Sequence, residues 1–306
     1  MRRLQANDGV GFRSIPDILK TTGSDWLDDK APRLAASLAL YTLLSLAPLL
    51  ILAVSVAGLM FGDEAARGQI QHQLSGILGE QGAAAVQSIL ANARAPSSGI
   101  LGTIVGLMLA LFGASGVFGE LQGTLNEIWD VDSKPGRGVK GFIKDRFFSF
   151  TLVLGVAFLL LVSLVVSAGL AALGAYFSSA LPGGAVVWQA INMVISLTVT
   201  TALFATIYKV VPDVHIDWRD VWLGALVTAV LFTLGKFAIA LYVGRSTVAS
   251  PFGAAGSVVA LVVWVYYSAQ ILFFGAELTQ VMTTRRGKTI APSKNAVKVE
   301  RKLEAA

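Results

Sequence analysis

Six long apolar stretches dominate this 306-residue chain and limit what it can fold into. A helix needs about 20 mostly apolar residues to cross a hydrocarbon core about 30 Å thick, and each stretch meets that length. They are Leu34–Phe61, Gly99–Gly119, Phe147–Phe177, Leu181–Tyr208, Val221–Val243 and Ser246–Ala276, with Lys236 as their one charged residue. A soluble domain is roughly 25% charged, whereas this chain is 14% charged. The pattern predicts an all-α polytopic membrane protein with six transmembrane helices.

The basic residues fall almost entirely on one side of the predicted spans. If successive loops alternate between the two sides, one side holds 20 of the 24 Lys and Arg residues. Cytoplasmic loops carry an excess of Lys and Arg, so both termini are expected in the cytoplasm. The same asymmetry explains the net charge of +5 without a nucleic-acid partner. Together with the short loops, it predicts a multi-pass protein of the bacterial inner membrane.

Three regions follow from this topology. Residues 1–33 are expected to hold a cytoplasmic N-terminal interfacial helix, residues 34–282 the transmembrane domain, and residues 283–306 a basic, disordered cytoplasmic tail. The expected spans cover about 34–61, 99–119, 147–177, 183–209, 221–243 and 254–281. Residues 62–98 are expected to form an outer cap of two short amphipathic helices, because apolar residues recur there at helical spacing.

The segment before the first span has apolar residues at helical spacing between Ile15 and Trp26. This spacing indicates one or two short helices, broken near Gly23. They lie either at the cytoplasmic membrane interface or packed on the bundle as ordinary surface helices.

Proline and small residues suggest how the helices pack. Pro48 is expected to kink the first span, because proline removes a backbone hydrogen bond inside a helix, and Pro212 is expected to end the fourth. The spacing Gly102-x-x-x-Gly106 lets helices approach closely. Such faces serve packing within the chain or a homo-oligomer. After the second span, Leu121, Leu125, Ile128 and Trp129 fall on one face of an amphipathic helix.

The sequence offers few residues for catalysis or metal binding. It contains no cysteine, no GxxxxGK[ST] loop and no HExxH, and its two histidines fall on opposite sides of the membrane by the topology above. Asp213, His215 and Asp217 alternate and would share one face of an extended segment. We interpret them instead as a turn between spans four and five, with Asp217 as the N-cap of the fifth. We expect no enzyme activity, metal or cofactor.

Lys236 is the first candidate for substrate binding. An ionisable group inside a span is costly and commonly faces a cavity or a partner. Lys236 would lie in the outer half of the fifth span, where it either reaches the outer headgroups with its long side chain or forms, with Arg245, the electropositive wall of a pocket.

The second candidate site is a polar cluster on the inner side, formed by Glu120, Asn126, Glu127 and Glu277. The alternative interpretation is that these side chains only solvate the membrane interface. The depth of Lys236 argues against a direct pair with Glu277, because the two lie near opposite ends of their spans.

Several motifs in order resemble the YihY/virulence factor BrkB family. They are the run Gly113–Trp129, Tyr208–Pro212 followed by Trp218-Arg219 and Gly224-Ala-Leu, and a C-terminal run with Gly256, Trp264-Val-Tyr266 and Gly275-Ala-Glu277-Leu278. The similarity covers roughly residues 20–285. It implies a six-helix inner-membrane protein with both termini inside, and it places Asn126, Pro212 and Glu277 at characteristic positions of the family.

Family members were once labelled ribonuclease BN, but this sequence shows neither clustered metal-binding carboxylates nor a pair of nuclease histidines. The resemblance instead suggests transport of lipids or lipid-like molecules. We therefore expect a transporter or lipid-translocating protein that contacts membrane lipids, with an anionic lipid or amphiphile as substrate. A non-transporting scaffold or accessory protein is the alternative, and a membrane-bound ribonuclease the least favoured.

Overall fold

Long helices make up most of the computed structural model, which describes residues 15–45, 116–134, 184–245, 256–288, 290–294 and 296–299. The helices are α1 (Ile15–Asp28), α6 (Gly184–Val210), α7 (Trp218–Arg245) and α9 (Gly256–Arg285), with helical segments at 31–45 and 116–128. Four short strands accompany them: β1 (Val131–Ser133), β2 (Val214–His215), β3 (Ala291–Pro292) and β4 (Ala296–Lys298).

Three of the described helices are long and apolar enough to cross a membrane. The qualifying segments are Val186–Val210, Trp218–Ala238 and Leu261–Arg285. They correspond to the expected spans 183–209, 221–243 and 254–281. Most of the first three expected spans, the outer cap and Pro48 lie outside the described residues, so the total of six spans stays a prediction.

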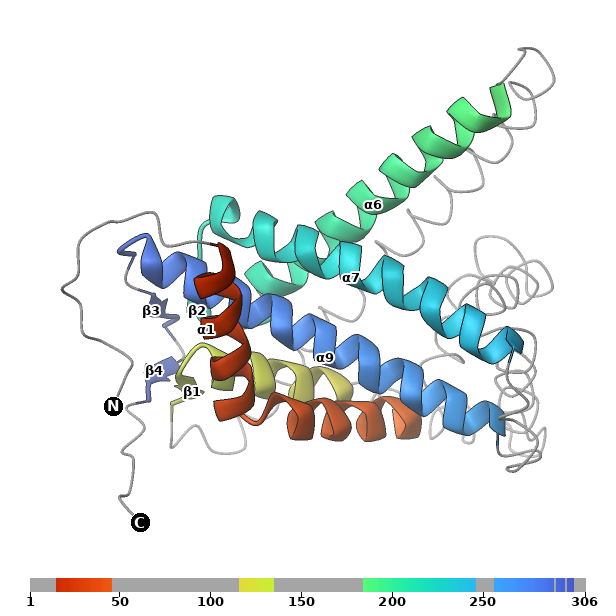
Figure 1. Cartoon of the computed structure of the whole chain (residues 1–306). Coiled ribbons are helices and arrows are strands. Elements are labelled where there is room, and N and C mark those ends of the chain that lie inside the picture. The colour runs from red at the N-terminus through yellow and green to blue at the C-terminus, as the bar shows by residue number, and fades with distance from the viewer. Residues whose placement is uncertain are drawn as a thin grey trace, which may run out of the picture.

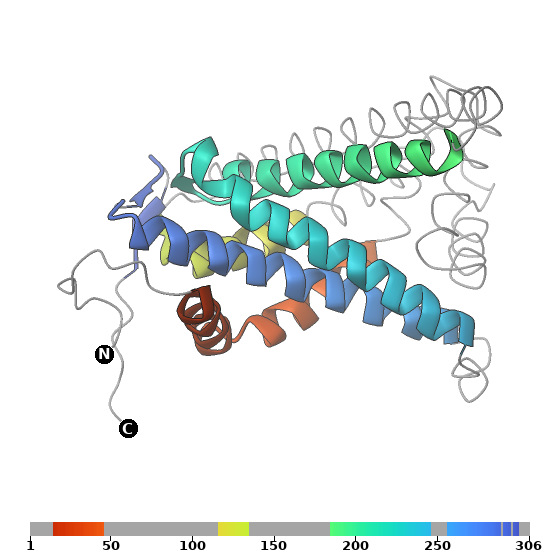
Figure 2. The same cartoon turned by 45° about the horizontal axis from the view of Figure 1, so that its top comes forward.

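Helices α7 and α9 run side by side in both views (Figures 1 and 2). Two glycines bring them into close contact. A Cβ atom on Gly224 would lie 2.7 Å from the carbonyl oxygen of Gly275 and overlap the Thr279 side chain. A Cβ atom on Gly275 would overlap the hydroxyls of Thr228 and Tyr208. Small residues therefore set the distance between these helices, as is usual where membrane helices pack tightly.

Helix α6 packs on α7 and α9 through its C-terminal half. The ring centroids of Phe204 and Phe232 lie 5.7 Å apart in an edge arrangement. The buried Tyr208 hydroxyl donates to the Leu272 carbonyl at 2.8 Å and lies 2.7 Å from Thr228 Oγ1. Towards its N-terminus α6 diverges from α7 (Figure 1), and its apolar side chains there, such as Val186 at 72% exposed, contact little of the described protein.

The helical segment 116–128 has the buried face that its sequence predicts. Leu121, Leu125, Ile128 and Trp129 are all buried, which confirms the expected amphipathic pattern. The helix ends where Asp130 takes a left-handed conformation with a φ of 52°. β1 follows directly.

Helix α1 is continuous through Gly23, so the expected break near that residue is wrong. A Cβ atom added to Gly23 would meet no described atom within 4 Å, and one glycine costs a helix only about 1 kcal/mol. The chain turns instead at Lys30, which has a φ of 55°. Helix α1 exposes Ile15 and Leu27, while Arg285 of α9 donates to its Thr21 hydroxyl at 2.7 Å.

The C-terminal tail differs from the disordered segment expected from residue 283. Helix α9 continues to Arg285, and the tail then adds β3 and β4. β3 pairs with β2 and β4 with β1, both antiparallel. The basic composition of the tail predicts disorder. The strands form because they pair with β1 and β2, which lie far away in the sequence and leave no sign in the local pattern.

Candidate functional site

The four short strands lie at one end of the helices (Figure 1), and several polar side chains from the segments around them bond to one another. We call residues 122–134, 209–220 and 277–299 the polar end. It contains the salt bridges of Lys288 and Arg286 with the start of α7, and hydrogen bonds that join helix 116–128 to Asp213 and to α9.

Asn126 and Asp213 form the centre of this end. The Asn126 amide donates to Asp213 Oδ2 at 3.0 Å, and its oxygen accepts the Asp213 backbone N–H at 2.7 Å. Gln122 donates to the same carboxylate oxygen at 3.1 Å. Asn126 is 6% exposed. We call this arrangement the Asn126–Asp213 clamp, because it ties helix 116–128 to the connection between α6 and α7.

Pro212 explains why Asp213 lies at the clamp. A proline cannot continue a helix or donate a backbone hydrogen bond, and α6 ends two residues earlier at Val210. The Val214 N–H donates to the Pro212 carbonyl at 2.9 Å. Lys209 donates to the Ile216 carbonyl across the turn. Pro212 therefore ends α6, as expected, and aims the following aspartate at helix 116–128.

Glu277 is completely buried within α9, at 0% exposed. It precedes the end of the helix at Arg285 by eight residues, or about 12 Å at 1.5 Å per residue. Gln280, one turn further on, donates to the Ile128 carbonyl at 2.6 Å. This side of α9 therefore packs on the end of helix 116–128. A carboxyl group inside a membrane-length helix is costly, and such groups commonly mark substrate or ion pathways.

The four residues of the predicted inner cluster occupy different surroundings. Asn126 and Glu127 line a polar hollow of about 390 Å³. Its other lining residues are Gly119, Gln122, Gly123, Asp130, Val131, Asp132 and Val299. Glu277 lies in the helix core, and the half-buried Glu120 is not part of the lining. The structure thus brings Asn126 and Glu127 together at the hollow and keeps Glu120 and Glu277 away from its wall.

A group of ion pairs lies at the start of α7, and the sequence alone does not predict it. Lys288 Nζ lies 2.8 Å from Asp217 and 2.6 Å from Asp220, and Arg286 lies 3.0 Å from Asp220. The Asp220 side chain is only 2% exposed. Asp217 directly precedes α7, at the N-cap position expected for it. The only sequence signal is an aspartate at the N-cap, Asp217, and a second in the first turn, Asp220, where negative charge is favourable.

The Lys288 ammonium lowers the pKa of Asp217, mainly by their hydrogen bond. The two aspartates raise the pKa of Lys288 in turn. The aspartate contributes stability above its ordinary pKa of about 3.9 and loses that contribution as pH falls through the lowered value. The lysine contribution is complete below about pH 10.4 and is lost as pH rises through the raised value. The pair is therefore fully charged throughout the neutral range.

Lys236 lines neither the polar hollow nor the apolar groove between α6 and α7 that is described below. It is half-buried on α7, and its Nζ lies 5.9 Å from the ring centroid of Phe237. Arg245 is nine residues further along the same helix. That spacing is two and a half turns, so the two positions fall on opposite sides of α7.

Packing between α7 and α9 also separates Lys236 from Glu277, as the sequence suggested. A Cβ on Gly235 would overlap the ring of Tyr267. Gly235 and its neighbour Lys236 therefore lie beside Tyr267, which precedes Glu277 by ten residues on α9. Ten helical residues span about 15 Å, too far for an ion pair.

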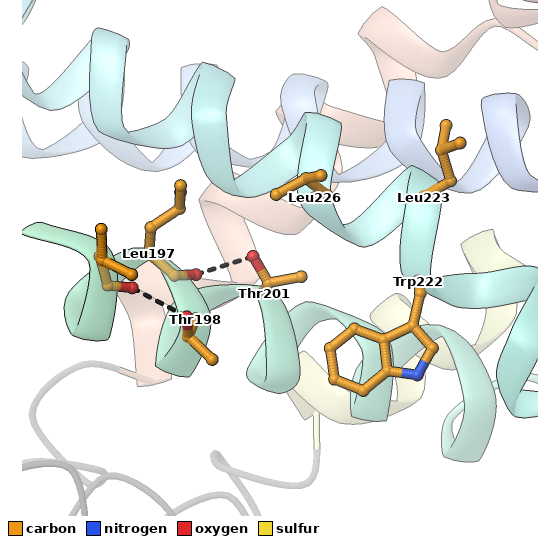
Figure 3. A pocket seen from close by; sticks show the side chains of 7 residues that line it. Leu197, Thr198, Thr201, Trp222, Leu223 and Leu226 are labelled. Carbon is orange, nitrogen blue, oxygen red and sulfur yellow. Dashed lines mark hydrogen bonds between the residues drawn. The ribbon is translucent and has the colours of Figure 1, made fainter.

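An apolar groove lies between α6 and α7 (Figure 3), and the sequence gave no signal for it. It has a volume of about 430 Å³. Its lining residues are Val194, Leu197, Thr198, Thr201, Trp222, Leu223 and Leu226. Both threonine hydroxyls donate to carbonyls of their own helix, at 2.8 and 2.7 Å. The groove therefore presents hydrocarbon and one indole ring, a surface suited to an acyl chain.

Comparison with known proteins identifies the family. Residues 22–300 match the family described as Virulence factor BrkB. The chain is 25% identical over 264 residues to a UPF0761 membrane protein of Psychrobacter sp., covering 85% of this chain and 47% of the relative. It is 27% identical over 292 residues to one of Pseudomonas aeruginosa, covering 92% and 64%. A third, from Pseudoalteromonas translucida, is 27% identical over 262 residues, covering 83% and 81%.

The chain spans about half to two thirds of the length of the first two relatives. No solved structure shows significant similarity to it. The family match covers nearly the whole chain and agrees with three described helices of membrane-spanning length. The chain is an integral membrane protein and belongs to the Virulence factor BrkB family.

Proposed function

We propose that this protein translocates an anionic lipid or a lipid-like amphiphile across the bacterial inner membrane, with six spans and both termini in the cytoplasm. The observation that carries the proposal is Glu277, a carboxyl group at 0% exposure inside a helix of membrane-spanning length. Desolvation of such a group is expensive, and a protein that only anchors or connects others gains nothing that would offset this cost. A transporter uses one to bind a polar group or to change charge during its cycle.

The apolar groove supports the choice of an amphiphile. Its lining offers hydrocarbon contacts along α6 and α7 and leaves both threonine hydroxyls bonded within their helix. Trp222 lies in the second turn of α7, near the polar end. Indole rings favour the headgroup layer of a membrane. A lipid with its chain in the groove would thus place its headgroup towards the polar end.

Reconstituted protein provides the test. Liposomes with a fluorescent anionic phospholipid in one leaflet should show flux above protein-free liposomes. Replacing Glu277 with glutamine keeps the size of the side chain and removes its ability to ionise. We expect this change to lower flux at least about tenfold, because transport groups of this kind act through charge. Glu120→Gln is the matched control, since Glu120 is half-buried on helix 116–128, and its flux should stay unchanged.

The possible outcomes separate the proposals. Absence of flux with the unchanged protein, or equal flux with Glu277→Gln, would contradict translocation through this carboxyl group. Lys236→Ala tests the substrate charge separately. Lower flux of anionic lipid alone would support a role in recognising the headgroup, whereas equal flux removes Lys236 from the mechanism.

A non-transporting scaffold or accessory protein is the second candidate. The observation that favours it is that Lys236, the charged residue expected to line a substrate pocket, lines neither described hollow. A scaffold would tolerate Glu277→Gln without any change in lipid movement, so the same flux measurement decides between the two.

Orientation has its own test, because the chain contains no cysteine. Single cysteines introduced at Arg13 and Lys302 should react with a membrane-impermeant maleimide in inside-out vesicles and stay unreacted in intact spheroplasts. Reaction of either cysteine in spheroplasts would overturn the proposed location of that terminus.

A further inference from the structure

One segment near the C-terminus bonds to all the other parts of the polar end. We call residues 286–299 the strap; the structure describes 286–288, 290–294 and 296–299 of it. The strap leaves the end of α9, passes the connection between α6 and α7 through β3, and reaches the end of helix 116–128 through β4.

The first attachment is electrostatic. Lys288 bonds to Asp217 and Asp220 at the start of α7, and Arg286 joins Asp220 at 3.0 Å. The Asp220 side chain is nearly inaccessible to solvent, at 2%. Two cations therefore neutralise a buried carboxylate that would otherwise be costly.

The second set of attachments uses the backbone. The Ser293 N–H donates to the Asp213 carbonyl at 2.8 Å, next to the Asn126–Asp213 clamp. The Val299 N–H donates to the Asp130 carbonyl at 2.8 Å. Val299 also forms part of the wall of the polar hollow. The strap therefore covers one side of the hollow while it connects two separate parts of the chain.

These attachments are individually weak. The strands contain two and three residues, and an isolated pair of strands is at best marginally stable in water. The covalent link to α9 makes closing intramolecular and lowers its entropic cost. A short segment held by few bonds can open without unfolding the helices, and Lys288 has the two shortest salt bridges that hold it.

We propose that the strap is a releasable latch, held closed by Lys288, that fixes the ends of α6, α7 and helix 116–128 against α9 and covers the polar hollow. Those ends cannot separate while the strap is paired. Its β3 binds β2, between α6 and α7, while its β4 binds β1, which follows helix 116–128. The latch is a property of the fold and does not depend on whether the protein moves a lipid.

Disulfide trapping tests the latch in the full-length protein. The chain has no native cysteine, so introduced pairs are its only thiols. His215 and Ala291 face each other in β2 and β3, and both are exposed. Asp132 and Val297 do so in β1 and β4. The distances between directly opposed residues in antiparallel strands suit a disulfide. Each pair, replaced by cysteines, should cross-link rapidly under mild oxidation in membranes.

Lys288→Met should slow cross-linking of both pairs by about three- to tenfold, the range expected when ion pairs are lost from a marginal contact. Arg285→Met is the matched control. Arg285 has the same charge and lies three residues away, but it bonds to Thr21 of α1, so its loss should leave both rates unchanged. Mixed single-cysteine proteins should give no cross-link, which shows that the bond forms within one chain.

Three results would overturn the latch. They are unchanged rates with Lys288→Met, equal slowing with Arg285→Met, and slowing of the His215–Ala291 pair alone, which would mean local fraying. If Lys288→Met fails to fold, Asp217→Asn replaces it, because Asp217 is exposed and its loss leaves the bond to Asp220. About twofold slowing of both pairs would then support the latch, and unchanged rates would reject it.

Discussion

Gly275→Ala is expected to destabilise the folded protein by about 3 kcal/mol, near the upper end of what overpacking costs. The new methyl group would overlap the hydroxyls of Thr228 and Tyr208 and lie 3.2 Å from Thr228 Cβ. The Tyr208 hydroxyl is itself fixed by its bond to the Leu272 carbonyl at 2.8 Å. Relief therefore requires separation of α7 from α9 or loss of a buried hydrogen bond.

Gly123→Ala is the matched control, because Gly123 is also inside a helix but a Cβ atom added there would meet no described atom within 4 Å. Alanine is favoured over glycine in a helix by roughly 0.5–1 kcal/mol. The control should therefore be neutral or slightly stabilising. Thermal melting of both purified variants in detergent checks the prediction. Equal melting temperatures for Gly275→Ala and the unchanged protein would show that the contact between α7 and α9 is looser than the structure indicates.

Thr228→Ala combined with Gly275→Ala extends the test. Removal of Oγ1 eliminates one overlap, while Tyr208 still opposes the new methyl group. The double variant should therefore recover only part of the lost stability. Full additivity of the two single effects would mean that the residues do not share a contact.

The features predicted from the sequence are those that depend on local spacing. Leu121, Leu125, Ile128 and Trp129 were placed on one buried face by helical period alone. The three described spans followed from length and hydropathy. Pro212 ended its helix as expected, because proline acts on neighbouring backbone atoms.

The features that the sequence did not predict depend on contacts between distant residues. Asp213 was interpreted as part of a turn, and nothing nearby in the sequence indicates that it bonds to Asn126, 87 positions away. The strap has the basic composition of a disordered tail. Its strands could not be predicted, because they pair with segments that precede it by more than 70 residues. The intramembrane charge of Lys236 drew attention because it is rare, yet it lines neither described hollow.

The candidate site was therefore predicted in part. Asn126 and Glu277 were both selected from the sequence, and both are buried at the polar end. Their expected association with Glu120 and Glu127 in one cluster rested on similar depth in the membrane. Depth fixes only one coordinate of a side chain, and the direction around each helix decides whether residues meet. Around helix 116–128, that direction turns Asn126 towards Asp213.

Asn126→Asp should destabilise the polar end, although the two side chains have nearly the same size. The amide that donates to Asp213 Oδ2 at 3.0 Å would become a second carboxylate oxygen. Two like charges at that distance, one of them on a buried residue, should cost about 2–4 kcal/mol at neutral pH. The penalty should shrink as pH falls. Repulsion between the two carboxylates raises the pKa of one of them, so that group takes up a proton and the repulsion ends.

The exchanged pair distinguishes repulsion from a general need for asparagine. In Asn126→Asp with Asp213→Asn, the amide at position 213 can donate to the carboxylate at position 126. Gln122 donates at 3.1 Å to the same oxygen of Asp213 that would become the amide nitrogen, so its bond is lost and the recovery stays short of complete. The double variant should regain most of the melting temperature lost by Asn126→Asp, measured in detergent at pH 7.5 and again near pH 4. If the exchange restored nothing at either pH, the clamp would not depend on the pairing of these two side chains. Recovery at pH 7.5 would instead show that the hydrogen bond between these two side chains helps to hold helix 116–128 to the connection between α6 and α7.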